Sequence, residues 1–274
     1  MHTIESFIKG KYNDPLLCED RIVITDQLVA VIDGATAQGN MLWDGHKSGK
    51  FASITLGNFI IDHSSSLSEG SAQSCFEVLT EHVSNMISER VSNKRLDIKD
   101  YPRASIIIYN NAKKEVWCYG DCQCIIGRTM FAITKSVDIL STSLRSFILE
   151  RALLLGASID TLINKDPGRD MIKQILETQF YFENLQIQFG YPVINGYNYE
   201  PQMVVTHSVK PDEEVILSTD GYPKLCPTLK ESEAVLQEYL RDDPLCFREN
   251  PSTKGLQAGM ISYDDRAYWR GRAT

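Results

Sequence analysis

Acidic residues stand at the ends of several apolar segments that have the character of β-strands. The segment Leu28–Ile32 is a run of five apolar residues, typical of a buried strand, and it ends on Asp33-Gly34. Asp is disfavoured within strands and is seldom fully buried without a partner. A single Asp-Gly pair at such a place is explained well enough by a turn that ends the strand.

The same arrangement recurs along the chain: Glu19-Asp20 before Ile22–Ile24, Gly120-Asp121 after Val116–Tyr119, Asp220-Gly221 after Val215–Thr219, and Asp264-Asp265 near the C-terminus. If these strand ends converge, their combined negative charge needs cations to neutralise it. Hard divalent ions with oxygen ligands are suited to that task. The recurrence therefore favours a metal site over a set of unrelated turns.

Composition and charge narrow the class of protein. The chain has 274 residues, 43% of them hydrophobic and 23% charged, which is ordinary for a globular protein. The formal net charge of −8 does not favour a nucleic-acid partner. Because no repeat or linker divides the sequence, we expect residues 1–274 to form a single domain.

The seven cysteines indicate a reducing compartment. Their number is odd and no signal peptide precedes them, so free thiols in a cytoplasmic protein are expected. Cys118, Cys122 and Cys124 lack a Cys-x-x-Cys pair or a neighbouring His, and we interpret them as strand residues. No apolar run approaches the roughly 20 residues that would span a membrane.

Periodicity predicts strands, then two helices, strands, helices and strands again. Strands are expected near 4–11, 22–25, 28–33, 104–110, 115–119, 124–126, 203–209, 214–218 and 267–269; helices over 52–60, 76–87, 139–148, from Asp166-Pro167 onward and over 231–241; the first helical part ends by the charged segment 93–100, and 184–200 is an irregular loop. This is not a βαβ alternation. An antiparallel sheet with segregated helices fits it better.

Taken in order, the acidic motifs resemble those of the metal-dependent protein phosphatases of type 2C, over about residues 4–270. The matching segments are Cys18-Glu19-Asp20-Arg21, Val31-Ile32-Asp33-Gly34, Gly120-Asp121-Cys122-Gln123, Ser218-Thr219-Asp220-Gly221 and Asp264-Asp265-Arg266. Each motif alone is weak, but five in the family's order form a fairly specific signal.

The resemblance implies an α+β fold in which two antiparallel sheets pack as a sandwich with helix pairs outside, in four layers, and a metal centre at one end. It also implies a set of roles: Asp33 bridges two Mg or Mn ions, Gly34 offers its carbonyl, Asp220 and Asp265 ligate the second ion, Glu19 and Asp20 act through metal-bound waters, and Asp121 helps to hold a possible third ion. Asp33, Asp220 and Asp265 are thus the expected catalytic residues.

The implied chemistry is hydrolysis by a metal-bridging hydroxide that attacks phosphorus in line. Many relatives carry a phosphate-anchoring Arg where this chain has Pro15, and many eukaryotic members carry a His where it has Ala35. Arg21 or Arg266 could replace the missing anchor, since guanidinium pairs bidentately with phosphate, although the favoured interpretation of each is an ordinary surface or strand-end arginine.

Three functions remain open at this point. The first is a phosphatase acting on phosphoserine or phosphothreonine in proteins, and the second is a phosphatase acting on a small phosphorylated metabolite. The third is a catalytically weak relative that binds a partner or a phosphoprotein and regulates it. Turnover of an aryl phosphate with added Mn, abolished by chelator, would separate the enzymes from the regulator.

Overall fold

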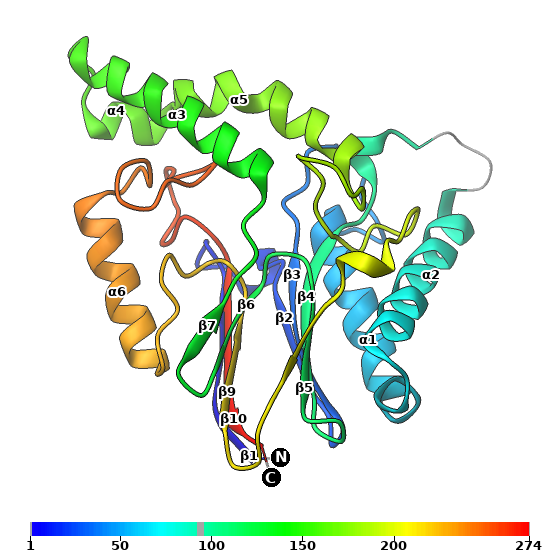
Figure 1. The fold of residues 1–274 in the computed structure, drawn as a ribbon. Coiled ribbons are helices and arrows are strands. Elements are labelled where there is room, and N and C mark those ends of the chain that lie inside the picture. Colours follow the sequence, from blue (N-terminus) through cyan, green and yellow to red (C-terminus); the bar gives the residue numbers. More distant parts are fainter. Residues whose placement is uncertain (1, 92–95, 274) are drawn as a thin grey trace.

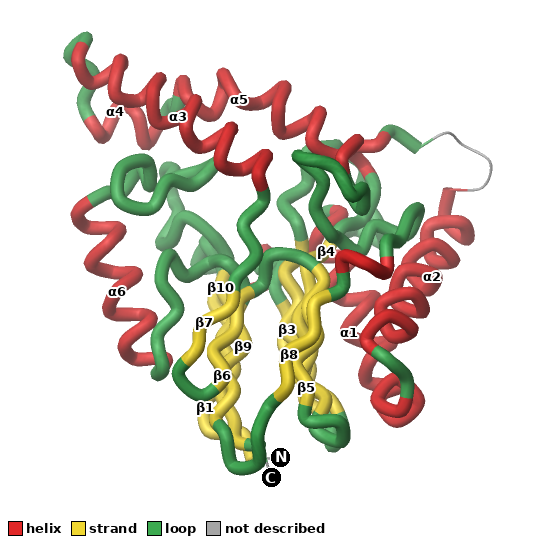
Figure 2. Tube along the Cα trace, in the orientation of Figure 1, coloured by secondary structure: helices red, strands yellow, loops and turns green. Residues whose placement is uncertain are grey.

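The computed structural model describes residues 2–91 and 96–273, and in this part of the chain two five-stranded sheets pack face to face (Figures 1 and 2). One sheet has the order β1-β10-β9-β6-β7 and the other β2-β3-β4-β5-β8, and all neighbouring strands are antiparallel. The strands are β1 (His2–Lys9), β2 (Arg21–Ile24), β3 (Leu28–Gly34), β4 (Ala104–Asn110), β5 (Glu115–Tyr119), β6 (Gln123–Ile126), β7 (Thr129–Phe131), β8 (Val205–Ser208), β9 (Glu214–Ser218) and β10 (Arg266–Arg272).

The helices form three separate groups around the sandwich. They are α1 (Ser48–Glu69), α2 (Ala72–Val91), α3 (Ser136–Leu154), α4 (Ile159–Asn164), α5 (Pro167–Thr178) and α6 (Leu229–Asp242). Figure 1 shows α1 and α2 against one outer face, α6 against the other, and α3 to α5 lying across one end of both sheets. The two chain termini lie together at the opposite end, where β1 pairs with β10.

Strand β3 shows how an uninterrupted apolar run serves two cores. Side chains of a strand alternate between its faces. Val29 and Val31 therefore point into the core between the sheets, and Ala30 and Ile32 point outward to the helices. Both faces are covered, so the strand needs no polar positions until it reaches Asp33 at its end.

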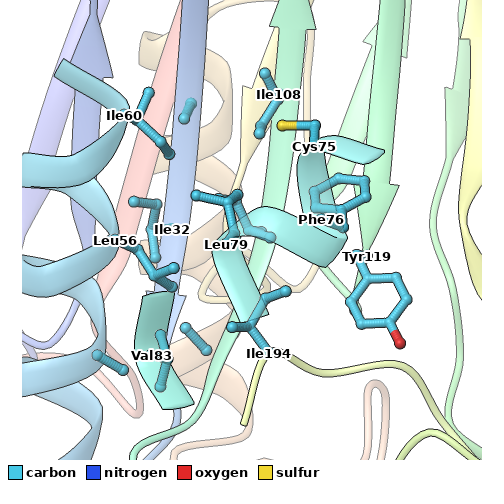
Figure 3. Packing of buried hydrophobic residues seen from close by; sticks show 14 of the residues in the cluster. Ile32, Leu56, Ile60, Cys75, Phe76, Leu79, Val83, Ile108, Tyr119 and Ile194 are labelled. Carbon is cyan, nitrogen blue, oxygen red and sulfur yellow. The ribbon is translucent and has the colours of Figure 1, made fainter. Parts of the chain in front are cut away.

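The outer core beneath α1 and α2 explains the apolar stripes of these helices. Leu56 and Ile60 of α1 and Phe76, Leu79 and Val83 of α2 are fully buried against the sheet (Figure 3). Such stripes are the faces by which amphipathic helices gain most of their stability. No functional role for them is needed.

The expected two-sheet α+β fold is confirmed. The differences concern short elements, the bounds of strands and the placement of helices outside the sheets. The sequence pattern did not indicate β7 or the short helix α4, because three- and six-residue elements carry too little periodicity. The strand expected from residue 203 begins at Val205, since Pro201–Met203 form a 3-10 turn. Residues 92–95, at the start of the charged segment 93–100, lie outside the described residues.

Layer assignment also differs from a sandwich with a helix pair on each side. The second sheet is covered by α6, which buries Leu236, Tyr239 and Leu240 against it. Helices α3 and α5 pack on each other and cross the end of the sandwich (Figure 1). Periodicity predicts that these helices have a buried face, but it does not say which surface they cover. Within the described part of the chain, no helix has the length and apolar character needed to cross a bilayer.

Candidate metal centre

A cavity of about 410 Å³ lies where the strand ends meet the α3–α5 layer. Its wall includes four of the acidic residues, each from a different segment: Asp33, Asp121, Asp220 and Asp264. The acids recognised along two hundred positions of sequence are therefore brought to one place. The convergence on which a metal site depends is present.

Asp33 and Asp220 form the centre of this acidic group. Asp33 ends β3 and Asp220 follows β9, so the two sheets each contribute one, and the two carboxyl groups hydrogen bond to each other. Burial, together with the negative charge of Asp20, Asp121 and Asp264, raises the pKa of Asp33 well above its usual range. Burial and the charge of Asp33 do the same to the pKa of Asp220. Without a cation, this pair is held together by a proton.

Gly34 allows the backbone to come close beside Asp33. A Cβ at this position would lie 2.4 Å from the carbonyl oxygen of Gly49 and 2.7 Å from that of Glu19. Only glycine fits there. The end of β3 is thus packed directly against the start of α1 and the first acidic motif.

Asp121 already has a cation. The Lys135 ammonium lies 2.5 Å from its carboxylate, and Lys135 also lies 3.7 Å from Asp138. Burial acts to raise the pKa of Asp121, but the Lys135 ammonium, together with hydrogen bonds from Ser105 and the backbone, holds that pKa below its usual range. The Asp121 carboxylate is therefore ionised and neutralised by this chain's own lysine.

The two neighbouring acids near the C-terminus have different surroundings. Asp264 lines the cavity and pairs with Lys254 at 2.6 Å and Lys11 at 3.4 Å. Burial opposes its ionisation, yet Lys254 and Lys11 hold the pKa of Asp264 below its usual range. Asp265 instead accepts hydrogen bonds from the backbone N–H groups of Lys11 (2.7 Å) and Glu19 (3.0 Å). Its carboxylate is occupied in joining two backbone segments and is not on the cavity wall.

Glu19 and Asp20 are buried behind the cavity. Asp20 accepts a hydrogen bond of 2.8 Å from the Thr219 hydroxyl, and Glu19 receives the Lys11 ammonium at 3.3 Å. Burial and the nearby Asp265 raise the pKa of Asp20 well above its usual range. The second oxygen of Glu19, Oε1, is buried with no hydrogen-bond partner. An orphaned carboxylate oxygen beside an acidic cavity is what a bound water or ion would satisfy.

The two arginines suggested as phosphate anchors are not at the cavity, and that suggestion is corrected. Arg21 faces outward from β2 and donates to the carbonyl of Ile54 (3.0 Å) and to the side chain of Asn58 (2.8 Å), both in α1. Arg266 faces outward from β10 and forms a two-bond pair with Glu233 of α6 at 2.6 and 2.8 Å. Both lie on the outer face of a sheet, where strand alternation places them.

The donor set fits a hard divalent cation. Carboxylate oxygens and a backbone carbonyl are the ligands that Mg and Mn prefer. Across residues 2–91 and 96–273, however, no three His, Cys, Asp or Glu side chains already form a close ligand set. Two of the four cavity acids are instead paired with lysines, Asp121 with Lys135 and Asp264 with Lys254.

Several residues at the site were not found from the sequence. Asp264 was passed over for its neighbour, and Lys11, Lys254 and Arg169 were not singled out at all. Of these, Lys254 and Arg169 line the cavity, and Lys11 is buried beside it. Only Asp264 had a usable signal, namely its place in the terminal motif. A lone lysine or arginine in a loop or helix start has none.

Comparisons with known proteins agree with the fold. No family model and no curated protein matches the chain. Among solved structures, the serine/threonine phosphatase Stp1 from Staphylococcus aureus matches with a TM-score of 0.50 at 14% identity, over 100% of this chain and 95% of that one. The Mycobacterium tuberculosis serine/threonine phosphatase PstP/Ppp (TM-score 0.49, 12% identity, 98% of both chains) and RsbX in complex with magnesium (TM-score 0.44, 12% identity, 99% of this chain and 98% of that one) are also similar. With its two antiparallel sheets, its helices and the full-length match to Stp1, the chain has the fold of the type 2C serine/threonine phosphatases.

Proposed function

We propose that this chain is a metal-dependent phosphatase that hydrolyses phosphomonoesters, with phosphoserine and phosphothreonine in proteins as its substrates. The observation that carries the proposal is the convergence of Asp33, Asp220 and Asp264 on one cavity that basic side chains also line. The fold of a serine/threonine phosphatase supports it. We further propose that residues 1–274 act as one catalytic domain, since the first and last strands pair with each other.

Within this proposal, Asp33 and Asp220 are the central metal ligands and the Gly34 carbonyl assists them. Asp264 takes the place expected for Asp265, because it lines the cavity and Lys11 and Lys254 keep it ionised. Glu19 and Asp20 would act on bound waters from behind. When bound, Mg or Mn supplies a hydroxide nucleophile near neutral pH and offsets charge on the phosphoryl oxygens.

We propose two ions in place of three. Asp121 is the residue that the family resemblance assigns to a third ion, but the Lys135 ammonium is 2.5 Å from its carboxylate. The Lys135 ammonium takes over part of the role of a metal ion, because it neutralises the acid without adding an exchangeable ligand site.

The test is hydrolysis of an aryl phosphate, and then of phosphoserine and phosphothreonine peptides, by the full chain with added Mn. Turnover that disappears with chelator and returns with Mn is the expected result. Release of phosphate from small metabolites but from no phosphopeptide would favour the metabolite reading. Absence of turnover in a protein that binds Mn tightly would reject the proposed phosphatase function.

A regulatory relative without turnover is the second candidate, and one observation favours it. Lysines pair with Asp121 and Asp264, so part of the acidic charge is neutralised without metal. A binding module could keep its fold in this way. It would nonetheless gain nothing from leaving Asp33 and Asp220 close together and without a cation.

The stabilisation by metal should depend on pH. The raised pKa values of Asp33 and Asp220 mean that the folded, metal-free protein retains protons which the unfolded chain loses. The contribution of this pair to the stability of the metal-free protein is therefore fully present below the unfolded pKa of Asp and is lost as the pH rises through the folded pKa values. Because Mn must displace the protons, the Mn-induced rise in Tm should be larger at pH 7.5 than at pH 5.5.

Thermal unfolding with and without Mn at the two pH values measures this difference. An Asp33→Asn, Asp220→Asn double variant is the control, because it has lost both titrating groups and should show little response to Mn at either pH. A wild-type response that is equal at both values, or larger at pH 5.5, would contradict the prediction.

A further inference from the structure

The cavity holds four basic side chains, and their partners differ. They are Arg103, Lys135, Arg169 and Lys254. A phosphoryl group needs donors that are positive and not already committed to a carboxylate, since charge-assisted hydrogen bonds to phosphate are the strong ones. The partners of each cation therefore decide which of them can serve.

Three of these four basic side chains are already paired with a carboxylate. Arg103 donates to Glu183 and to the carbonyls of Tyr101 (2.9 Å) and Ile98 (2.6 Å). Lys135 is paired with Asp121, and Lys254 is paired with Asp264. These three cations therefore already neutralise a carboxylate or hold a neighbouring segment in place.

Arg169 is the exception among them. Its one side-chain hydrogen bond runs from Nη1 to the carbonyl of Thr253 at 2.8 Å, and within residues 2–91 and 96–273 no carboxylate pairs with it at 4.0 Å or less. Its Nε and Nη2 donors are thus uncommitted. Burial and the neighbouring Arg145 lower the pKa of Arg169, while Asp166, Asp264 and Asp138 act on it through space in the opposite direction.

The position of Arg169 is fixed by contacts of the buried side chain of Arg145. Arg169 lies in the first turn of α5, where its backbone N–H donates to the capping Asp166 at 2.8 Å. Asp166 is held by the fully buried Arg145, which also donates to the carbonyls of Leu245, Cys246 and Ser252. The start of α5 and the loop that carries Thr253 are therefore held by the same guanidinium.

Neighbouring packing reinforces this placement. A Cβ on Gly168 would lie 2.7 Å from the carbonyl oxygen of Arg145, so α5 and α3 approach closely at this point. The carboxylates come from the strand ends, whereas Arg169 comes from the helical layer that crosses them (Figure 1). A group in the cavity would lie between the two.

We propose that Arg169 binds the phosphoryl oxygens of the substrate and of the product phosphate, in the role that an N-terminal arginine has in relatives and that Pro15 leaves vacant here. This rests on the proposed phosphatase function. The bond made is a hydrogen-bonded ion pair from Nε and Nη2, the guanidinium edge that makes no hydrogen bond within the described part of the chain. Arg169 is in this sense a substrate-binding residue.

The test is titration of inorganic phosphate into the Mn-loaded full chain, followed by calorimetry. R169Q should bind phosphate about tenfold or more weakly than the wild type, the ratio expected for loss of a charge-assisted pair. R169K keeps the charge but loses the planar fork, so its affinity should lie between the two. R151Q, an exposed arginine on α3, is the matched control and should bind as the wild type does.

Mn affinity and Tm, measured in parallel, show whether R169Q is folded and metal-loaded, and R169K covers the case in which R169Q fails to fold. Phosphate binding by R169Q within twofold of the wild type would overturn the proposal, as would an R169K variant that binds phosphate as tightly as the wild type, or a wild type that binds no phosphate at millimolar concentration.

Failure of the phosphatase function is a separate outcome. A wild type that binds phosphate through Arg169 yet hydrolyses no phosphoester would reject the enzyme and leave the anion site standing. Conversely, turnover by R169Q with an unchanged KM would leave the enzyme standing and overturn the role of Arg169.

Discussion

Asp33→Asn is expected to abolish Mn-dependent hydrolysis of an aryl phosphate and to remove the stabilisation that Mn gives. Asp33 lies at the centre of the acidic group and hydrogen bonds to Asp220. Substitutions that only support a metal ligand lower affinity or activity by about 10- to 100-fold, so loss of a central ligand should exceed about 100-fold. Steady-state rates and Mn titrations measure both effects.

The same substitution should not unfold the protein. The raised pKa of Asp33 shows that its ionised form is unfavourable where it stands, and Asn removes the charge while keeping the shape. The Tm of the variant in chelator should therefore equal or exceed that of the wild type. Asp242→Asn, at an exposed position at the end of α6, is the control and should change neither property. Full activity in Asp33→Asn would contradict the proposed site.

Lys11→Met is expected to destabilise the metal-free protein by about 3–5 kcal/mol, as for the removal of one partner from a buried ion pair. The Lys11 ammonium is buried and lies 3.2–3.4 Å from carboxylate oxygens of Glu19, Asp264 and Asp265. Burial alone would lower the pKa of Lys11, but the three carboxylates raise it by more than burial lowers it, so the ammonium stays charged. Methionine fills much of the same volume but leaves the acids without their cation.

Urea unfolding in the presence of chelator measures this loss. Lys173→Met, at an exposed position on α5, is the matched control and should change stability by about 0.5 kcal/mol or less. The deficit of Lys11→Met should shrink as the pH falls below about 4, where carboxyl groups take up protons. A variant as stable as the wild type at neutral pH would show that these acids do not depend on Lys11.

The Asp33 and Lys11 predictions concern one electrostatic arrangement, the first through an acid and the second through a cation that neutralises acids. Lys11, Lys135 and Lys254 pair directly with the acids at the edge of the cluster. Within residues 2–91 and 96–273 no lysine or arginine forms an ion pair with Asp33 or Asp220 at its centre, and Lys135 acts on Asp220 through space. A divalent ion would therefore stabilise the protein most by binding at Asp33 and Asp220. The lysines allow the fold to persist without one.

Most strands could be predicted because their signal is local. The run Leu28–Ile32 ends at Asp33, and the structure places β3 at Leu28–Gly34 with that carboxylate at its end. The hairpin of β4 and β5 and the final strand β10 also lie where apolar alternation predicted them. A strand's pattern is a property of five to seven consecutive residues and does not need the rest of the chain.

The roles of the neighbouring acids Asp264 and Asp265 could not be predicted from the local sequence. Both stand in the same motif, and only packing distinguishes them: the backbone N–H groups of Lys11 and Glu19 bind Asp265, while Asp264 faces the cavity. Those partners lie about 250 positions away in sequence. No pattern within the motif records them.

The sequence by itself determined that acids end successive strands and that an antiparallel sheet with segregated helices would carry them, because strand and helix periods are short-range properties. That the strands form two sheets packed as a sandwich was implied only by the resemblance to the type 2C phosphatases. Only the tertiary structure decided that Arg21 and Arg266 face the outer helices and that Arg169 reaches the cavity from α5. Which layer covers the strand ends depends on contacts between segments distant in sequence, and those contacts form only when the whole chain packs.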